Sequence, residues 1–400
     1  MDPEPNSSTV DFLNKLPTEI WQMIFSAIPS HAFLTADEST DPLVFLRTST
    51  LDHRAMIKIQ MERLELMTVC KAFYPLAEEL LYKHVALSGK VLNNCSFQRA
   101  ALQKASASTS GRSRGDLTTY IQVFDIIPDT SHFDLRLVCP YLRVYHDSSF
   151  ATSLNLHRMK DEEWSLGVTT LAVKYPIQWH NLTILSRCFP KLTTLSLLSA
   201  DFGPRVDPRL TITFRRLQNL TVDANVLKRI PFNQIKFPSL CWLCVYLHVD
   251  YDFNAIQTLL ESVNHTLTGL WIHNRPLAQP LLLVSMSAPG TLDNLRTLII
   301  HLGSDSSADV ANGMAGKFPS LEHLMFMIDC RWDVLQVIER YAHYFSNATA
   351  LQLKEVTLMI SRFCSYSYIE TGALNSVHGL FPGVPVEFQV ASDVSLFSTA

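Results

Sequence analysis

The sequence predicts an α/β protein in which a small helical module precedes a long, curved array of short parallel strands. Three observations carry this prediction. The 400 residues include 56 leucines, while charged residues make up only 18%, below the roughly 25% usual in soluble domains. An amphipathic helix pattern of about eleven residues lies near the N-terminus. Beyond residue 117, a Leu-x-x-Leu-x-Leu pattern returns with a period of about 26 residues.

We expect the helical module at residues 12–84, after a flexible tail at 1–11. Pro17 precedes a first helix that ends near Pro29, and further helices are expected over 56–73 and after Pro75. Two apolar stripes run along the first helix; one holds Ile20, Ile24 and Ile28, and the other Trp21 and Phe25. A helix with so wide an apolar arc needs two packing partners.

The residues of this module carry a resemblance. LPxEIWxxIF at 16–25, VCKxF at 69–73 and LLY at 80–82 resemble the F-box in a form common in fungi. The F-box is the helical module that docks on the Skp adaptor of cullin-RING ubiquitin ligases. The resemblance implies an adaptor-binding set of nine residues: Leu16, Pro17, Ile20, Ile24, Phe25, Leu66, Val69, Cys70 and Phe73. Residues 31–54 exceed the usual connection and are interpreted as an insert. The alternative is a helical cap that only covers the end of a larger domain.

The recurring leucine pattern occupies residues 117–400. Its second apolar position falls on Leu171, Leu195, Leu220, Leu243, Leu270, Leu298, Leu324 and Val356. The intervals are 24, 25, 23, 27, 28, 26 and 32 residues, and a unit of about 20–29 residues with one strand and one return is typical of leucine-rich repeats. Three units begin with the same Phe-Pro-x-Leu tetrad, at 189–192, 237–240 and 318–321. This repetition favours true structural repeats.

The region resembles the irregular leucine-rich repeats that follow F-boxes in many substrate receptors. The regular family has an asparagine eight positions after the first leucine, and here only Asn225 fits, so we expect an irregular solenoid with parallel strands on its concave side. Helical returns are expected at 255–263 and 334–345. Residues 85–116 should hold a first strand and a mobile, serine-rich linker. Strands are also expected near 85–87, 121–123 and 142–145, but the pattern does not fix their register.

Side chains alternate across a strand, so the residues between the leucines should face the concave surface. The centre of that surface would be rich in aromatic and histidine side chains and suited to binding a target protein. The candidate target-binding residues are Trp242, Tyr246, Trp271, His273, His301 and His323. Two alternatives stay open. In the first, the C-terminal tail partly covers this surface. In the second, the register is shifted by one residue, which turns the whole set inward.

Other classes of function are disfavoured. The net charge is −4, with 33 basic and 37 acidic residues dispersed along the chain, which disfavours nucleic acid as a partner. No apolar stretch approaches the ~20 residues needed to cross a membrane. Eight cysteines without a framework spacing predict reduced thiols in a soluble cytoplasmic or nuclear protein. Cys241-x-x-Cys244 lacks the second ligand pair of a zinc site, and no catalytic motif is found. We expect neither a metal nor a cofactor.

The expected function is therefore that of a non-catalytic substrate-recognition subunit of a Skp–cullin–F-box ubiquitin ligase. Its N-terminal helices would bind the Skp adaptor, and thereby the other cullin-RING ligase subunits. Its repeat domain would bind a target protein whose identity the sequence does not reveal. Two alternatives remain: a leucine-rich-repeat scaffold without a link to ubiquitination, and an enzyme that uses a His/Cys cluster.

Overall fold

A computed structural model defines the fold. It describes residues 17, 20, 21, 23, 65, 84–87, 123–126, 142–147, 166–173, 177, 179–198, 211–247, 253–274, 292–302, 318–328, 338–339, 352–361 and 371–391. The tail at 1–11, the insert at 31–54, the linker at 88–116 and most of the expected helical module lie outside these residues. None of the described helices is long and apolar enough to cross a membrane.

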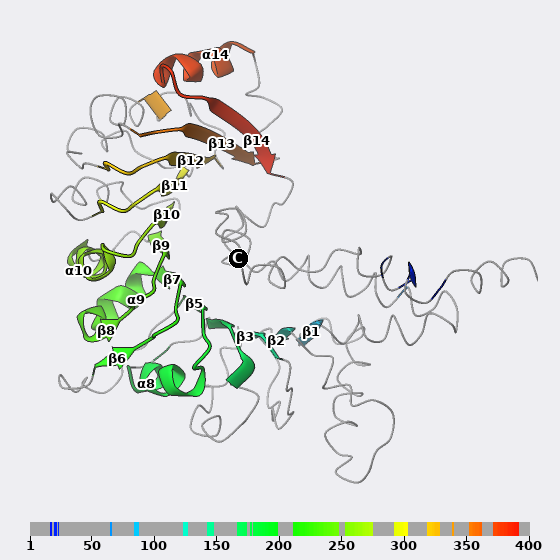
Figure 1. Cartoon of the computed structure of the whole chain (residues 1–400), viewed down its shortest axis with the longest axis vertical. Helices are drawn as coiled ribbons and strands as arrows, with labels where there is room; N and C mark the ends of the chain where they lie inside the picture. The colour runs from blue at the N-terminus through cyan, green and yellow to red at the C-terminus, as the bar shows by residue number, and fades with distance from the viewer. Residues whose placement is uncertain are drawn as a thin grey trace, which may run out of the picture.

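Within the described residues, twelve strands form one parallel sheet whose order follows the sequence. They stack along an arc (Figure 1). The strands are β1 His84–Leu87, β2 Val123–Ile126, β3 Val144–Asp147, β4 Thr170–Val173, β5 Thr194–Leu197, β7 Asn219–Asp223, β9 Trp242–Leu247, β10 Gly269–Asn274, β11 Thr297–Leu302, β12 His323–Ile328, β13 Glu355–Ser361 and β14 Val386–Ala391. Because neighbouring strands are parallel, each connection returns the chain to the edge where it started.

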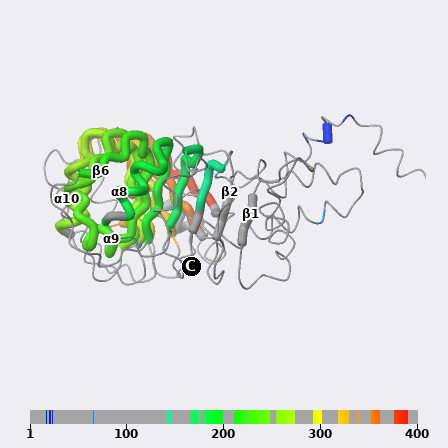
Figure 2. The backbone as a smooth tube through the Cα atoms, turned by 90° about the horizontal axis from the view of Figure 1, so that it is seen from below, coloured from blue at the N-terminus to red at the C-terminus, as the bar shows by residue number. Residues whose placement is uncertain are grey.

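The returns hold the helices and a second, two-stranded sheet. They comprise α8 Trp179–Cys188, β6 Ile212–Thr213, α9 Ala224–Arg229, the 3-10 helix η5 Phe232–Gln234, β8 Ile235–Lys236, α10 Phe253–Val263 and α14 Thr371–Leu380. Helices α8, α9 and α10 lie on the outer side of the arc (Figure 1). Seen from below, α8, α9, α10 and β6 lie close together on the left of the view (Figure 2). The predicted helical return at 255–263 is confirmed by α10. Only Ile338 and Glu339 of the return at 334–345 are described, and both are helical.

The predicted leucine positions form a single row across the sheet. Leu171 pairs with Leu195, Leu195 with Leu220 and Leu220 with Leu243. The row continues through Leu270, Leu298, Leu324 and Val356. All eight side chains are buried in the core between the sheet and its returns. The predicted register is therefore confirmed from β4 to β13.

The three Phe-Pro-x-Leu tetrads form the same turn ahead of a strand. The amide of the fourth residue donates to the carbonyl of the first at 3.2 Å for Leu192, 3.3 Å for Leu240 and 3.2 Å for Leu321. Each phenylalanine is buried. The same bond closes the turns at 292–295 and 381–384, both at 3.1 Å. The last of these precedes β14, a strand that the sequence analysis did not predict.

Two expected strands are displaced, each starting two residues too early. The sequence analysis put a strand near 121–123, whereas β2 covers Val123–Ile126 and aligns Phe124 with Val85 and Tyr145. The sequence IQVFDII offers apolar residues at both alternating sets of positions, so the pattern alone does not choose between them. The strand expected near 142–145 is displaced in the same way, because β3 covers Val144–Asp147. The strand expected near 85–87 lies within β1.

Candidate functional site

The residues between the leucines lie on the opposite face of the sheet, turned away from α8, α9 and α10. We call this the inner face. Three rows cross it in register. The first holds Asn219, Trp242, Gly269, Thr297 and His323; the second Thr221, Cys244, Trp271, Ile299 and Met325; the third Asp223, Tyr246, His273, His301 and Met327. The predicted facing of these residues is confirmed, and the alternative of a register shifted by one residue is wrong.

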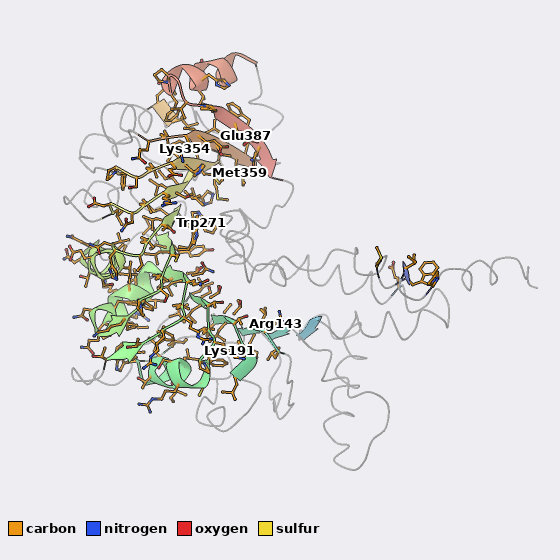
Figure 3. All side chains as sticks on the ribbon, in the orientation of Figure 1. Arg143, Lys191, Trp271, Lys354, Met359 and Glu387 are labelled. Carbon is orange, nitrogen blue, oxygen red and sulfur yellow. The ribbon has the colours of Figure 1, made fainter. Side chains whose placement is uncertain are left out.

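Five of the six candidate target-binding residues are nevertheless buried, and the expectation that they form an exposed binding surface is wrong. Trp242, Tyr246, Trp271, His273 and His301 are each at most 7% exposed. The three aromatic residues belong with Cys244, Ile299, Met325, Met327 and Met359 to a second apolar core, and the rings of the two histidines pack against it. We call the whole set the inner-face cluster. Figure 3 labels two of its members, Trp271 and Met359.

Packing among large rings accounts for much of the structure of this cluster. The ring centroids of Tyr246 and His273 are 4.5 Å apart, and those of Trp271 and His273 are 5.4 Å apart in an edge-on arrangement. Such contacts stabilise aromatic pairs beyond the burial of their area. Covering side chains of this size is favourable by roughly 1.5–3 kcal/mol each. The alternation of the sequence reports which way these residues point, but not whether that face is covered.

Gly269 gives Trp242 its position. The two residues are partners in adjacent strands, and a Cβ added to Gly269 would overlap the indole ring of Trp242. The indole therefore lies across β10 directly over the glycine. This is a packing role for a glycine on a strand, where close approach of another group is a common reason for the residue.

His273 and His301 form a buried pair on neighbouring strands. The Nδ1 atom of His301 is 3.1 Å from the Nε2 atom of His273, so one ring nitrogen donates a hydrogen bond and the other accepts it. Burial lowers the pKa of His301 from 6.5 to about 4. His301 is therefore neutral at physiological pH. His323 does not join this pair, because it aligns with Thr297 while His301 aligns with Met327.

The two cysteines of Cys241-x-x-Cys244 are free thiols and are poorly suited to react. Burial raises the pKa of the Cys244 thiol well above its ordinary value, opposed by a hydrogen bond with Thr221. Burial also raises the pKa of Cys241, whose Sγ donates to the carbonyl of Ser239 at 3.4 Å. The thiolate is the nucleophilic and metal-binding form. In the part of the chain that the structure describes, no three His, Cys, Asp or Glu residues are placed to hold a metal ion.

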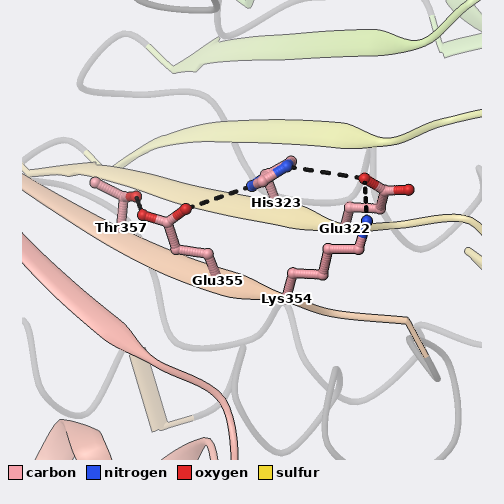
Figure 4. Close-up of polar contacts among 5 residues, drawn as sticks. All are labelled: Glu322, His323, Lys354, Glu355 and Thr357. Carbon is pink, nitrogen blue, oxygen red and sulfur yellow. Dashed lines mark hydrogen bonds and ion pairs between the residues drawn. The ribbon is translucent and has the colours of Figure 1, made fainter.

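His323 is the candidate target-binding residue that water reaches. Its side chain is 46% exposed and lies 3.6 Å from a carboxylate oxygen of Glu355 and 3.9 Å from one of Glu322. Glu322 also pairs with Lys354 at 3.0 Å, and this hydrogen bond holds the pKa of Glu322 below its ordinary value. Figure 4 shows this charged group. It lies where β12 and β13 begin, an edge that we call the strand-entry edge.

The strand-entry edge also carries basic residues that the sequence analysis missed. Lys191, Arg215, Arg216 and Lys236 are exposed in the turns and short strands ahead of β5, β7 and β9. A charge count by segment finds them, because residues 177–247 hold nine lysines and arginines but three aspartates. The basic and acidic residues are thus less evenly dispersed than a count over the whole chain indicated.

Two of the nine candidate adaptor-binding residues are described, Pro17 and Ile20. The amides of Ile20 and Trp21 donate to the carbonyl of Pro17 at 3.0 and 3.3 Å, so a helical turn begins where the sequence analysis expected it. Ile20 is 38% exposed and Met23, one turn further on, is 65% exposed. The other seven, Leu16, Ile24, Phe25, Leu66, Val69, Cys70 and Phe73, lie outside the described residues.

The fold and these sites define a class: an α/β protein with one long parallel sheet, a buried inner face and a charged strand-entry edge. A scan against models of known protein families gives no match for this sequence, and a search of curated proteins gives none.

Proposed function

We propose that this protein is the substrate-recognition subunit of a Skp–cullin–F-box ubiquitin ligase. An F-box at residues 12–84 binds the Skp adaptor, and an irregular leucine-rich-repeat solenoid binds the target protein. The chain acts by proximity, because it holds the target near a ubiquitin-carrying enzyme supplied by other subunits of the complex.

The observation that carries the adaptor-binding half is the F-box-like motif together with the exposure of Ile20. An isoleucine at the start of a helix gains stability when its side chain is covered. Ile20 instead remains 38% exposed, beside the still more exposed Met23. An apolar helix surface left open in the isolated chain is what a docking helix requires.

The order of the strands supports the solenoid half of the proposal. Each strand pairs with the next one of the sheet along the chain, one leucine row runs from β4 to β13, and the same turn recurs ahead of several strands. Units that contact only their neighbours in this way are the mark of repeat proteins. The buried histidines and protonated thiols of the inner face act as packing groups, which favours a receptor over an enzyme.

The test is retention of the purified Skp adaptor by the full chain. Ile20→Asp places a charge on the predicted interface and is expected to weaken binding about tenfold or more, because a buried, unpaired charge is costly. The residue is partly exposed, so the fold should survive. Gln22→Asp is the matched control, since residues two apart in the expected first helix do not share a face.

Failure of the wild-type chain to retain the adaptor, or equal loss in both variants, would contradict the proposal. If the adaptor is not retained while the chain still captures a protein partner, the scaffold without a ligase becomes the better interpretation. The double variant Ile24→Asp, Phe25→Asp extends the same test to the next turn of the motif.

A further inference from the structure

The charge of this protein is unevenly distributed. Residues 177–247 carry a formal charge of +6, from nine basic and three acidic residues, and the remainder of the chain therefore carries −10 out of a total of −4. Within the described part of this segment, Asp223 is the only acidic residue. It is buried and caps α9 by accepting a hydrogen bond from the Asn225 amide at 2.8 Å. It cannot neutralise the surface.

Four of the basic residues gather at the strand-entry edge. Thr194 pairs with Asn219, which places Lys191 and Arg216, each three residues earlier, at equivalent positions of neighbouring turns. Strands in a sheet lie about 4.8 Å apart, so these two turns are close neighbours. Figure 3 labels Lys191 near α8, at the lower end of the arc.

Lys236 joins the same group from the next unit. It pairs with Thr213, and its carbonyl accepts a hydrogen bond from the Phe214 amide at 3.0 Å. The rings of Phe214 and Phe237 stack with centroids 5.9 Å apart. The hydroxyl of Ser239 also donates to the carbonyl of Arg215 at 2.9 Å. The two turns are thus fixed against each other. We call Lys191, Arg215, Arg216 and Lys236 the basic edge.

Within the part of the chain that the structure describes, the charges of the basic edge are not paired, unlike those of the strand-entry edge at β12 and β13. At β12 and β13, Lys354 is paired with Glu322 at 3.0 Å, and Glu355 lies beside His323. Among the described residues, no ion pair involves a member of the basic edge. Arg187, Lys228 and Arg229 are also exposed nearby, but they stand in the last turns of α8 and α9, where positive charge stabilises a helix. The four residues of the basic edge have no such local role.

We infer that the basic edge docks an acidic, carboxylate-rich segment of the target protein. This inference rests on the proposed receptor function for the identity of the partner as a target. The inner-face cluster is buried and offers no open surface for recognition, whereas the side chains of the basic edge are exposed to a partner. Four like charges held together, with no acidic side chain paired to them among the described residues, attract an anionic partner and speed its association.

A peptide fits this surface better than a nucleic acid. The basic edge draws on three neighbouring units of the array, which at the usual spacing of strands span about 10 Å, a length that suits a short acidic segment better than a long phosphate backbone. Single-stranded nucleic acids are also held by stacking of bases on exposed aromatic rings. The aromatic residues of these turns, Phe214, Phe232 and Phe237, are buried.

The experiment measures binding of the full chain to a fluorescein-labelled decapeptide of alternating glutamate and serine, by fluorescence anisotropy at about 0.1 M salt. The double variant Lys191→Ala, Arg216→Ala is expected to lower the affinity about fivefold, given the modest strength of each exposed ion pair. The control is Arg296→Ala, Lys354→Ala, which removes two positive charges from the same edge outside the basic edge. It should change the affinity less than twofold.

The inference is overturned if the wild-type chain does not bind the peptide, or if both double variants lose the same affinity. Tighter binding of a labelled single-stranded DNA of equal charge would overturn the assignment to an acidic protein segment. Retention of the Skp adaptor is measured on the same variants. If peptide binding depends on Lys191 and Arg216 but the adaptor is never retained, the docking surface stands and the ligase assignment fails.

Discussion

At the scale of single residues, the inner face depends on small and uncharged groups beneath and between large rings. Gly269 leaves room for the Trp242 indole, and His301 packs against His273 as a neutral ring. Packing alone restricts which side chains these two positions tolerate, without any catalytic role. Both residues contribute to the stability of the inner-face cluster, and each contribution can be measured.

Replacing Gly269 by alanine should destabilise the fold by about 1–3 kcal/mol, because the new methyl group forces the Trp242 ring to move. Urea unfolding measures the free energy. Gly379→Ala is the control, since a Cβ there meets nothing within 4 Å and alanine favours a helix by up to about 1 kcal/mol. Equal effects of the two substitutions would show that Trp242 does not lie over Gly269.

Acidification should destabilise the protein through His301. The pKa of this side chain is about 4 in the folded chain and 6.5 without the burial. Between these values the unfolded chain binds a proton that the folded chain does not. The free energy of unfolding therefore falls by about 3 kcal/mol as the pH drops from 6.5 to 4.

His301→Asn should remove this part of the pH dependence, which urea unfolding at several pH values measures. Met327→Leu is the control, because it changes the packing on the strand position paired with His301 without removing an ionisable group, and it should retain the wild-type slope. A wild-type slope in His301→Asn would mean that His301 is accessible to protons in the folded chain.

At the scale of elements, the recurring turn ahead of the strands joins the register of the sheet to the core. The phenylalanine of the turn is buried in the core of its repeat unit. The hydrogen bond from the amide of the fourth residue to the carbonyl of the first sets the direction in which the next strand begins. In the turn at 318–321, Phe318 is 1% exposed while Pro319 is exposed. The two neighbours should therefore respond very differently to substitution.

Phe318→Ala is expected to destabilise the fold by about 3–5 kcal/mol, the usual cost of emptying a buried phenylalanine site. Pro319→Ala should cost about 1 kcal/mol or less, because it acts mainly on the unfolded chain. Thermal unfolding followed by circular dichroism compares the two. A small effect of Phe318→Ala would indicate that the turn does not anchor β12.

Sequence reasoning worked best where periodicity carries the information. A slip of one residue turns every side chain of a strand to the other face, so the spacing of the leucines was enough to place β4 to β13 in register. The last strand was missed, although Phe381-Pro382-Gly383-Val384 repeats the turn signal with valine in place of leucine. A search that allowed this exchange would have found β14.

The candidate site was harder to predict than the fold. Alternation placed Trp271 and His273 on the inner face correctly, but burial depends on what lies against that face, and a strand's own sequence does not encode this. The basic edge was missed for another reason. Lys191, Arg216 and Lys236 come from three separate units, and they become neighbours only when the strands are paired.

At the scale of the whole molecule, the sheet separates two kinds of surface. Among the described residues, the side chains that the strands direct to either face are largely apolar and buried, whereas the strand-entry edge carries exposed charge, basic near β5 to β9 and paired near β12 and β13. A partner that binds along the strand-entry edge would therefore meet a different charge near β5 to β9 than near β12 and β13. The proposed docking of an acidic segment therefore also fixes the direction in which it can bind.

The strictly sequential order of the strands has a consequence for how the protein is made. Parallel sheets usually fold slowly, because their strands must find distant partners. Here the paired positions of β4 to β13 are 23 to 32 residues apart, from the step between Leu220 and Leu243 to that between Leu324 and Val356. When a new strand leaves the ribosome, the neighbouring strand with which it pairs has already been synthesised. The growing chain can thus be assembled in the order of its translation, without waiting for its C-terminus.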